Sequence, residues 1–243
     1  MRLKLKYLFI ELTRKCNMGC KHCLRGKSED KSVSCEVLSH LLANVADIGQ
    51  LTLTGGEPSL ASRELDNLVY CLRKYGVRVK SFVCYVNGAK HNPEFISALE
   101  KLYSLCKEKE HCKLGISRDG FHGETDPNAV GALSALPFFR SFVPENDSLL
   151  GNQIYNEGRA RENGIGHFDF TVPECFYKVK FDGGIAASDF VYCNADGDIV
   201  FSPDLSYENQ KAHIAGNVLT EELDLIIVRN MYRYEDEHGT HVY

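Results

Sequence analysis

The chain has 243 residues, of which 44% are hydrophobic and 25% are charged, and its 28 Lys and Arg against 33 Asp and Glu give a formal net charge of −5. This length allows one large α/β domain with a small second unit, and the composition is that of a soluble globular protein. The absence of a block rich in Lys and Arg argues against a nucleic-acid-binding protein, and no apolar run reaches the roughly 18 to 20 residues that span a membrane.

The N-terminus looks superficially like a signal peptide, because basic residues precede an apolar run. Glu11, Arg14 and Lys15 end that run early, and no small-residue cleavage site follows. Ten cysteines in a chain without a targeting signal indicate a reducing cytoplasm, where thiols stay free or bind metal. We therefore predict a cytoplasmic protein.

Residues 7–12 form a short apolar run bounded by charge, which predicts a first buried strand. The strand leads directly into a segment with thiols at Cys16, Cys20 and Cys23. Three thiols within eight residues are more typical of a soft metal centre than of a disulfide framework. Three ligands suit a four-iron cluster in which one iron is left open.

A zinc-binding or structural thiol loop is the alternative interpretation of this segment. Structural zinc usually takes four protein ligands, commonly as two separated pairs, and no obvious second pair is present. His22 or Cys35 would have to complete such a site.

Beyond the cysteine segment the chain alternates between helical apolar stripes and short apolar runs. The expected helices lie around residues 37–48, 65–72, 95–106 and 129–136, and the expected strands around 51–54, 77–86, 114–117, 139–143 and 153–156. Ser34 is the expected N-cap of the first helix, and Pro93 lies in the expected first turn of the third. Alternating apolar strands and helices predict an α/β fold with a parallel sheet, most simply a partial (β/α)6 TIM-like barrel.

Beyond Gly166 the sequence pattern changes, and short strand patterns alternate with glycine turns. The expected strands lie around residues 176–181, 189–193, 198–201 and 214–218. A last helix is expected after Thr220, with Glu221 and Glu222 in its first turn, and residues 234–238 are expected to be a solvated acidic tail. We divide the chain into a barrel, residues 1–168, and a small antiparallel β appendage with a terminal helix, residues 169–243.

Polar motifs follow successive predicted strands. These are Gly55, Gly56 and Glu57 after the second strand, Asn87 after the third, and Ser117 and Asp119 after the fourth. In barrels of parallel strands the loops at the carboxyl ends of the strands meet, so these motifs and the cysteines should share one site. Two glycines before a carboxylate let the backbone and Glu57 approach a small cationic group. Each motif is also compatible with an ordinary strand exit or turn.

The cysteine triplet, followed after about thirty residues by Gly-Gly-Glu, resembles the signature of the radical S-adenosylmethionine (SAM) superfamily. The resemblance covers residues 7–165 and implies that Cys16, Cys20 and Cys23 hold a [4Fe–4S] cluster whose remaining iron binds SAM. The implied SAM-binding residues are His22 near the adenine, Gly55, Gly56 and Glu57 at the methionine amine, Ser117, Asp119 and Arg159 at the ribose or carboxylate, and Asn87. A surface arginine is the competing interpretation of Arg159.

The C-terminal region is similar in outline to the SPASM or twitch extension of peptide- and protein-modifying members of that superfamily. The similarity rests on residues 193–200 and 216–218. Where such a hairpin would carry its second cysteine, the chain has Phe201 to Asp204 instead. A cluster needs about four ligands, and only Cys175 and Cys193 are present, so we expect a degenerate extension without an auxiliary cluster. Whether these two cysteines bind any metal stays open.

The resemblance implies that one electron from an external donor similar to flavodoxin or ferredoxin reaches the cluster and cleaves SAM to methionine and a 5′-deoxyadenosyl radical, which abstracts hydrogen from a substrate. The Cys-Lys-His-Cys triplet and the SPASM-like tail favour a peptide or protein substrate, as in the maturases of ribosomally made peptides. The alternatives are an activase that installs a glycyl radical on a partner enzyme and a non-catalytic metal-binding module. The substrate, the bond formed and the oligomeric state are not encoded in any motif.

Overall fold

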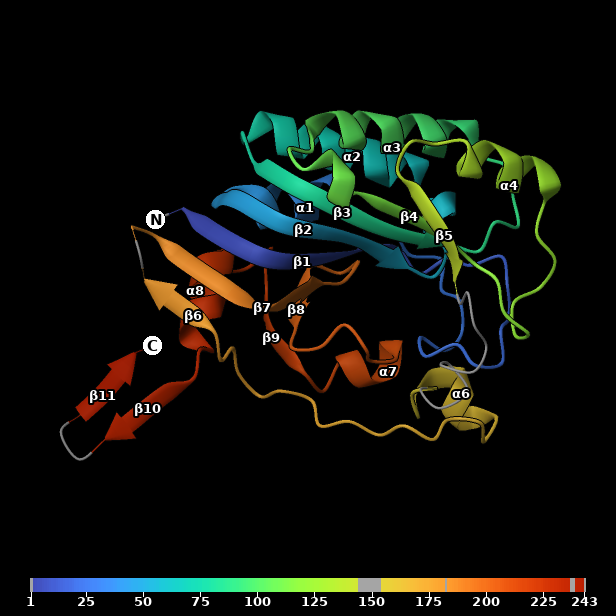
Figure 1. The fold of residues 1–243 in the computed structure, drawn as a ribbon. Helices are drawn as coiled ribbons and strands as arrows, with labels where there is room; N and C mark the ends of the chain where they lie inside the picture. The colour runs from blue at the N-terminus through green and yellow to red at the C-terminus, as the bar shows by residue number, and fades with distance from the viewer. Residues whose placement is uncertain (1, 144–153, 182, 237–238, 243) are drawn as a thin grey trace.

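The computed structural model describes residues 2–143, 154–181, 183–236 and 239–242, and its centre is a nine-stranded sheet (Figure 1). The strands are ordered β5-β4-β3-β2-β1-β7-β8-β9, and β6 pairs beside β7. The first five are β1 (Leu3–Thr13), β2 (Val45–Gly55), β3 (Arg78–Val86), β4 (Lys113–Ser117) and β5 (Phe139–Val143), and each is parallel to its neighbours among them. Because this order has two ends, the sheet is an open, partial barrel, as the sequence predicts.

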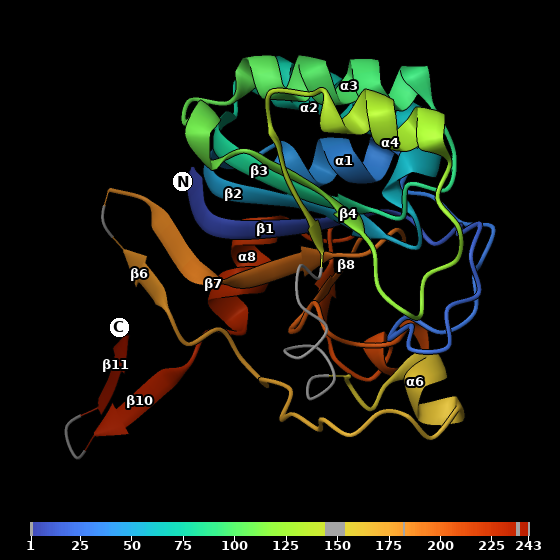
Figure 2. The same cartoon turned by 45° about the vertical axis from the view of Figure 1, so that its right-hand side comes forward.

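Helices cover one face of this sheet. They are α1 (Cys35–Leu42), α2 (Ser62–Lys74), α3 (Pro93–Leu105) and α4 (Pro127–Ser134), and Figures 1 and 2 show α2, α3 and α4 on the same side of the strands. Leu8 and Ile10 of β1 are fully buried beneath them, within one continuous hydrophobic core. The predicted cap of α1 is confirmed, because the Val37 N–H donates to Ser34 Oγ at 3.1 Å. Two short 3-10 segments, Pro58–Leu60 and Lys109–His111, complete the connections.

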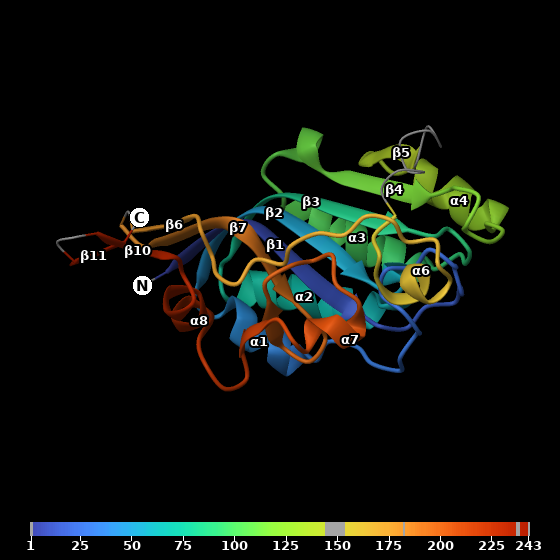
Figure 3. The same ribbon diagram turned by 90° about the horizontal axis from the view of Figure 1, so that it is seen from below.

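The C-terminal strands extend the barrel sheet. They are β6 (Val179–Phe181), β7 (Ile185–Cys193), β8 (Asp198–Val200) and β9 (Ile214–Asn217), and the predicted antiparallel pairings are present between β6, β7, β8 and β9. β7 runs parallel to β1, with Phe190 opposite Tyr7 and Tyr192 opposite Phe9. Viewed from below in Figure 3, β1 therefore lies between β2 and β7 rather than at an edge.

The described residues of the C-terminal half form three further helices. α8 (Leu223–Arg229) buries Leu223, Ile226 and Ile227 in the main core. α6 (Gly158–Glu162) and α7 (Tyr207–Gln210) lie on the face of the sheet opposite α2 and α3 (Figure 1). No helix in the described ranges has both the length and the apolar character that a membrane crossing requires.

The first helix is shorter than its apolar stripe predicted. α1 ends at Leu42, and Val45 and Ile48 belong to β2, so their assignment to the helix was wrong. The pairing of β1 with β2 shifts by one residue after Leu3, which opposes Val45, while Lys4 opposes Asp47. The extra residue puts two buried side chains three positions apart on one face of a strand, and this spacing imitates a helix.

Three C-terminal predictions also need correction. Thr220 does not cap α8, because its hydroxyl donates to Asn217 O at 3.0 Å and Glu222 occupies the cap position. The expected acidic tail contributes to an antiparallel hairpin of β10 (Arg233–Asp236) and β11 (Gly239–Val242). The expected sixth barrel strand begins at residue 153, outside the described residues, and its described part forms only an isolated bridge between Tyr155 and Phe168.

Candidate active site

The three cysteines that follow β1 lie together in the fold. Cys16, Cys20 and Cys23 are half-buried free thiols that line a single cavity. Burial, together with the neighbouring Cys23 and Cys16, raises the pKa of Cys20 to about 11, and burial also raises the pKa of Cys16. Ionising several thiols here is costly unless a cation shares the site, so the donor set suits a thiolate-bound metal centre.

The backbone closes the base of the loop that carries these thiols. Arg14 N–H donates to Lys31 O at 2.8 Å, and Glu29 N–H donates to Arg14 O at 3.1 Å. Just inside this closure, Cys16 N–H donates to Ser28 Oγ at 2.9 Å. The position of Cys16 is therefore fixed by hydrogen bonds to the segment of residues 28–31, where the loop returns to β1.

The cavity has a volume of about 340 Å³ and gathers residues from four successive strand ends. Besides the three cysteines it is lined by Met18, His22, Leu24, Arg25, Thr54, Gly55, Gly56, Glu57, Tyr85, Val86, Asn87, Ser117 and His122. The structure thus brings His22, Gly55, Gly56, Glu57, Asn87 and Ser117 to the thiols, as their positions after parallel strands predicted.

The two glycines at the end of β2 have a steric role toward β1. Gly55 has φ +151°, and a Cβ there would overlap the carbonyl oxygen of Thr13. A Cβ on Gly56 would overlap the carbonyl oxygen of Lys15. The Gly-Gly pair is therefore required for the close approach of β2 to the start of the cysteine loop, in addition to any contact with a ligand.

Glu57 is a buried carboxylate, with 2% of its surface exposed, at the floor of the cavity. Its Oε1 accepts from Ser59 N–H at 3.0 Å and its Oε2 from Asn87 N–H at 2.9 Å. Burial raises the pKa of Glu57 to about 7, against the opposing effect of these two hydrogen bonds. Asn87 in turn donates through Nδ2 to Asn17 Oδ1 at 2.8 Å, which links β3 to the cysteine loop.

Asp119 organises the loop after β4. Its Oδ1 accepts from Phe121 N–H at 2.8 Å and lies 2.8 Å from His122 Nδ1, and its pKa is lowered by these hydrogen bonds against the effect of burial. The loop places the rings of Phe121 and His122 within 5 Å of the His22 ring, at centroid distances of 4.8 and 4.9 Å. Ligand atoms of His22, Asp119 and His122 lie within 4.8 Å of one another, so these three side chains could also hold a metal ion.

Arg159 lies over the cysteine loop and is not among the described residues that line the cavity. Its N–H donates to Cys23 O at 2.9 Å, and its Nη1 stands 2.8 Å from where a Cβ on Gly19 would be. The positive charge of Arg159 lowers the pKa of Cys16, although burial has the larger, opposite effect.

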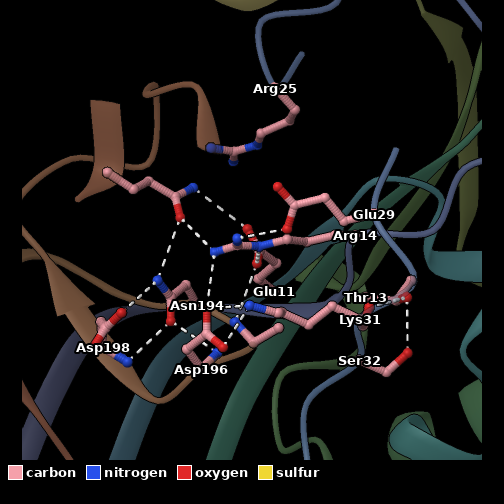
Figure 4. A network of polar contacts seen from close by, with 12 residues as sticks. Glu11, Thr13, Arg14, Arg25, Glu29, Lys31, Ser32, Asn194, Asp196 and Asp198 are labelled. Carbon is pink, nitrogen blue, oxygen red and sulfur yellow. Dashed lines mark hydrogen bonds and ion pairs between the residues drawn. The ribbon is translucent and has the colours of Figure 1, made fainter. Parts of the chain in front are cut away.

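A buried polar network joins the cysteine loop to the C-terminal half of the chain (Figure 4). Arg14 donates to Glu11 Oε1 at 2.7 Å, to Glu29 Oε2 at 2.9 Å and to Gln210 Oε1 at 3.1 Å. Glu11 also accepts from the Tyr192 hydroxyl at 2.6 Å. Arg14, two positions before the first cysteine, is thus linked to residues of β7 and α7, and its partner Gln210 lies 196 residues away in sequence.

Sequence reasoning missed several residues of the site. His122 could have been found, because it follows Asp119 by three residues in a loop already expected to face the cavity. Arg25 and Tyr85 also line the cavity, but neither belongs to a motif that distinguishes it from a surface residue or a strand aromatic. Their positions become visible only once the strands are paired.

A family model of the radical SAM superfamily matches residues 10–107. Over these residues the chain is similar to the radical SAM superfamily. A radical SAM domain implies a [4Fe–4S] cluster and SAM as cofactors. The matched residues run from the end of β1 to just beyond α3 and include the cysteine loop, the Gly-Gly-Glu segment and Asn87.

One protein of known sequence and two solved structures are similar to this chain. An uncharacterised protein of Methanocaldococcus jannaschii, MJ0907, is 27% identical over 150 residues, which cover 57% of this chain and 50% of the relative. The match thus spans half the length of that relative. The solved structure of anSMEcpe with bound AdoMet and Cp18Cys peptide has a TM-score of 0.55 at 14% identity, covering 92% of this chain and 80% of that one, and shows the same fold. Streptococcus suis SuiB bound to its precursor peptide SuiA is more distant, with a TM-score of 0.47 at 11% identity and coverages of 98% and 70%.

Proposed function

We propose that this chain is a radical SAM enzyme that modifies a peptide or protein, and that Cys16, Cys20 and Cys23 are the three protein ligands of its [4Fe–4S] cluster. The observation that carries the proposal is the single cavity into which all three thiols and the ends of β2, β3 and β4 project. A zinc or disulfide role for the thiols would not require that the glycine–carboxylate segment and two further strand ends surround them.

The cluster, when bound and reduced by an external one-electron donor, supplies the electron that splits SAM into methionine and a 5′-deoxyadenosyl radical, and that radical takes a hydrogen atom from the substrate. The protein supplies three thiolates on a loop closed at its base by Arg14 and Lys31. Their arrangement leaves the open side of the loop facing the rest of the cavity.

For SAM we propose contacts from Gly55, Gly56 and Glu57 and from Asn87 and Ser117. Glu57 is held in one orientation, since each of its carboxyl oxygens accepts a backbone N–H, so it presents a fixed oxygen acceptor to a cationic amine. His22 lines the same cavity, and its ring lies 4.8 Å from the Phe121 ring, so these rings offer flat surfaces suited to an adenine. Asp119 acts by holding His122 and the loop that carries Phe121.

Arg159 is a weaker candidate for the SAM carboxylate than its sequence position suggested. Its guanidinium stands next to Gly19 of the cysteine loop, and Arg159 is not among the described residues that line the cavity. We propose instead that its charge acts on the thiols, since it favours the ionised form of Cys16.

A peptide substrate is supported by the inner face of the open sheet. Leu8 and Ile10 of β1 point into the helix-covered core, so the alternating Tyr7 and Phe9 point to the other face. There Phe190 of β7 packs edge-on against both rings, at 5.2 and 5.5 Å, and remains 48% exposed. The similarity to the peptide-bound structure of anSMEcpe points the same way.

A metal-binding module without catalysis is the second candidate function. The observation that favours it is the group of His22, Asp119 and His122, whose ligand atoms lie within 4.8 Å of one another beside the thiols. Thiols and imidazoles together are typical ligands of zinc.

Anaerobic reconstitution with iron and sulfide, followed by SAM and a strong reductant, tests the proposal. We expect a brown protein that releases 5′-deoxyadenosine and methionine, and we expect replacement of Cys16, Cys20 and Cys23 by alanine to abolish both colour and product. Cys35→Ala, which removes an exposed thiol outside the cavity, is the matched control and should retain both. A colourless protein that binds one zinc would support the metal-binding module instead.

Product analysis separates the two radical enzymes. A mass change in a peptide encoded beside this gene would support the peptide-modifying function. A stable protein radical on a larger partner, with no modified peptide, would support a glycyl-radical activase.

A further inference from the structure

A second cavity lies where the central strands begin, at the far end of these strands from the thiols. It has a volume of about 600 Å³ and is lined by residues from the starts of β1, β2 and β3, from β7 and from the segment before β4. Figure 3 shows β7, β1, β2 and β3 side by side. None of the described residues that line it also lines the thiol cavity, so the contacts proposed for the cluster and SAM leave it unused.

This cavity is positively charged, although the chain as a whole carries a net charge of −5. Four cations line it against two carboxylates, and each carboxylate is already paired with a cation of β3. Asp47 accepts from Arg78 at 2.6 and 2.7 Å, and a carboxylate oxygen of Glu108 lies 3.1 Å from Lys80 Nζ. Two cations therefore remain without a carboxylate in the cavity.

Lys4 and Lys6 of β1 are these two cations. Both are exposed, and neither forms an ion pair with another residue of the described ranges. The Cα of Lys4 opposes that of Asp47, but Arg78 occupies both oxygens of this carboxylate. Lys6 Nζ lies 5.1 Å from the ring centroid of its neighbour Tyr7. Two ammonium groups that line one cavity without a counter-ion favour an anionic ligand.

The surface beside the cavity favours an acidic peptide over a nucleic acid. Tyr7 lines the cavity and also belongs to the aromatic face proposed above to bind the peptide. Its ring meets that of Phe190 at 69°, edge-on, so the two rings do not form a flat platform on which successive bases stack. The negative charge of the whole chain also opposes a continuous phosphate backbone. A peptide, in contrast, presents apolar and acidic side chains a few residues apart.

The basic cavity and the thiol cavity lie on the same strands. On β3, Lys80 lines the basic cavity and Tyr85 lines the thiol cavity, and on β2 the corresponding residues are Gln50 and Thr54. At about 3.3 Å per residue, the five steps from Lys80 to Tyr85 cover about 17 Å. An extended peptide needs about five residues for the same length.

We propose that the cavity at Lys4 and Lys6 binds acidic side chains of the peptide substrate, about five residues away from the residue that is modified. The inference rests on the peptide-modifying function proposed above and names the chemistry by which that substrate is selected. Apolar side chains of the same peptide contact Tyr7 and Phe190, and the charge of the cavity selects the substrate at a distance from the reacting atoms.

The test is fluorescence anisotropy with the full-length protein after reconstitution, its iron content being measured on the same sample. The probes are two labelled peptides of glycine and serine. In one, a run of glutamates stands five residues from a phenylalanine, and in the other the glutamates are replaced by glutamines. We expect the wild type to bind the glutamate peptide about tenfold more tightly at low salt, and the preference to shrink as salt screens the charges.

Three double variants locate the preference. Lys4→Gln/Lys6→Gln should lose it and keep the wild-type unfolding midpoint, because neither lysine is in an ion pair. Lys4→Arg/Lys6→Arg retains both charges and should retain the preference. Lys74→Gln/Lys211→Gln is the matched control, because it removes two exposed lysines that do not line the cavity, and Lys74 lies over a neighbouring tyrosine as Lys6 does.

Equal binding of the two peptides by the wild type would overturn the proposal, and so would an unchanged preference in Lys4→Gln/Lys6→Gln or an equal loss in the control. Tighter binding of a labelled oligothymidine than of the glutamate peptide, lost in the same variant, would assign the cavity to a nucleic acid and contradict the proposal. A wild type that takes up no iron would contradict the radical function instead. The charge preference needs no cluster and would still decide the present proposal.

Discussion

The cysteine loop is supported differently on its two sides. Toward β2 the support is steric, because Gly55 and Gly56 allow the backbone of β2 to approach that of β1 where no side chain would fit. Toward the C-terminal half the support is electrostatic, because Arg14 bonds Glu11 and Gln210 in a buried network. We therefore expect the stability of the loop to fall when volume is added on the β2 side and when charge is removed on the C-terminal side.

The largest effect should come from breaking the electrostatic side. Arg14→Ala leaves Glu11, which is fully buried, without its cation, and removing one partner of a buried pair typically costs about 3 to 5 kcal/mol. Urea unfolding of the reduced apo protein measures this loss. Arg78→Ala is the control, because it breaks an equally short pair with Asp47 that is largely exposed, and its unfolding midpoint should stay near that of the wild type. Equal losses in the two variants would contradict the contrast between buried and exposed pairs.

The steric side should respond to a single methyl group. Gly55→Ala forces a side chain onto a residue at φ +151° and against the Thr13 carbonyl, so we expect a loss of about 2 to 4 kcal/mol and reduced iron uptake. Gly131→Ala adds the same methyl group in α4, where nothing lies within 4 Å, and should be neutral or stabilise the protein by up to about 1 kcal/mol. The measurement is the unfolding free energy of the two variants. Gly55→Ala should be less stable than Gly131→Ala, and the opposite order would contradict the steric role of Gly55.

Glu57 makes the steric side sensitive to pH in the apo protein. Its pKa is raised by burial from 4.5 to about 7, so the folded state holds more protons than the unfolded state between these values. The contribution of Glu57 to stability is therefore greatest below pH 4.5 and falls as the pH rises through 7, by about 1 to 3 kcal/mol. Glu57→Gln imitates the neutral acid and should remove this fall. The measurement is the unfolding free energy of the wild type and of Glu57→Gln across this pH range. If the two free energies change with pH in parallel, ionisation of Glu57 does not destabilise the folded protein.

The parts of the fold that the sequence predicted are those set by local pattern. The bounds of β5, the Ser34 cap and the order of motifs after β1, β2, β3 and β4 follow from apolar spacing and turn residues, and they were sufficient to bring the thiols and the Gly-Gly-Glu segment to one cavity. Two local patterns misled: a shift in strand register gave Val45 and Ile48 a helical spacing, and Thr220 was taken as the cap of α8 although Glu222 holds that position.

The parts that were not predicted depend on pairing between distant segments. Nothing in the sequence places β7 beside β1, and so nothing places Tyr192 against Glu11 or Gln210 against Arg14. The residues of such a buried polar network do not recur at regular sequence intervals, because what matters for each is its charge and the length of its side chain. No sequence pattern therefore predicts the network.

The smallest effect is expected for a cysteine on the C-terminal side. Cys193 is fully buried in the core, where burial raises its pKa, and its Sγ lies 3.6 Å from Asn194 O, while Cys175 is half-buried. If this side supports the loop only through polar contacts, Cys175→Ser should keep the wild-type iron content of about four per chain and leave stability unchanged. Iron analysis after reconstitution gives the answer. A wild-type iron content near eight per chain that falls by half in Cys175→Ser would mean that the C-terminal side binds a cluster of its own. The two sides would then differ in whether they supply cluster ligands, and not in steric against electrostatic support.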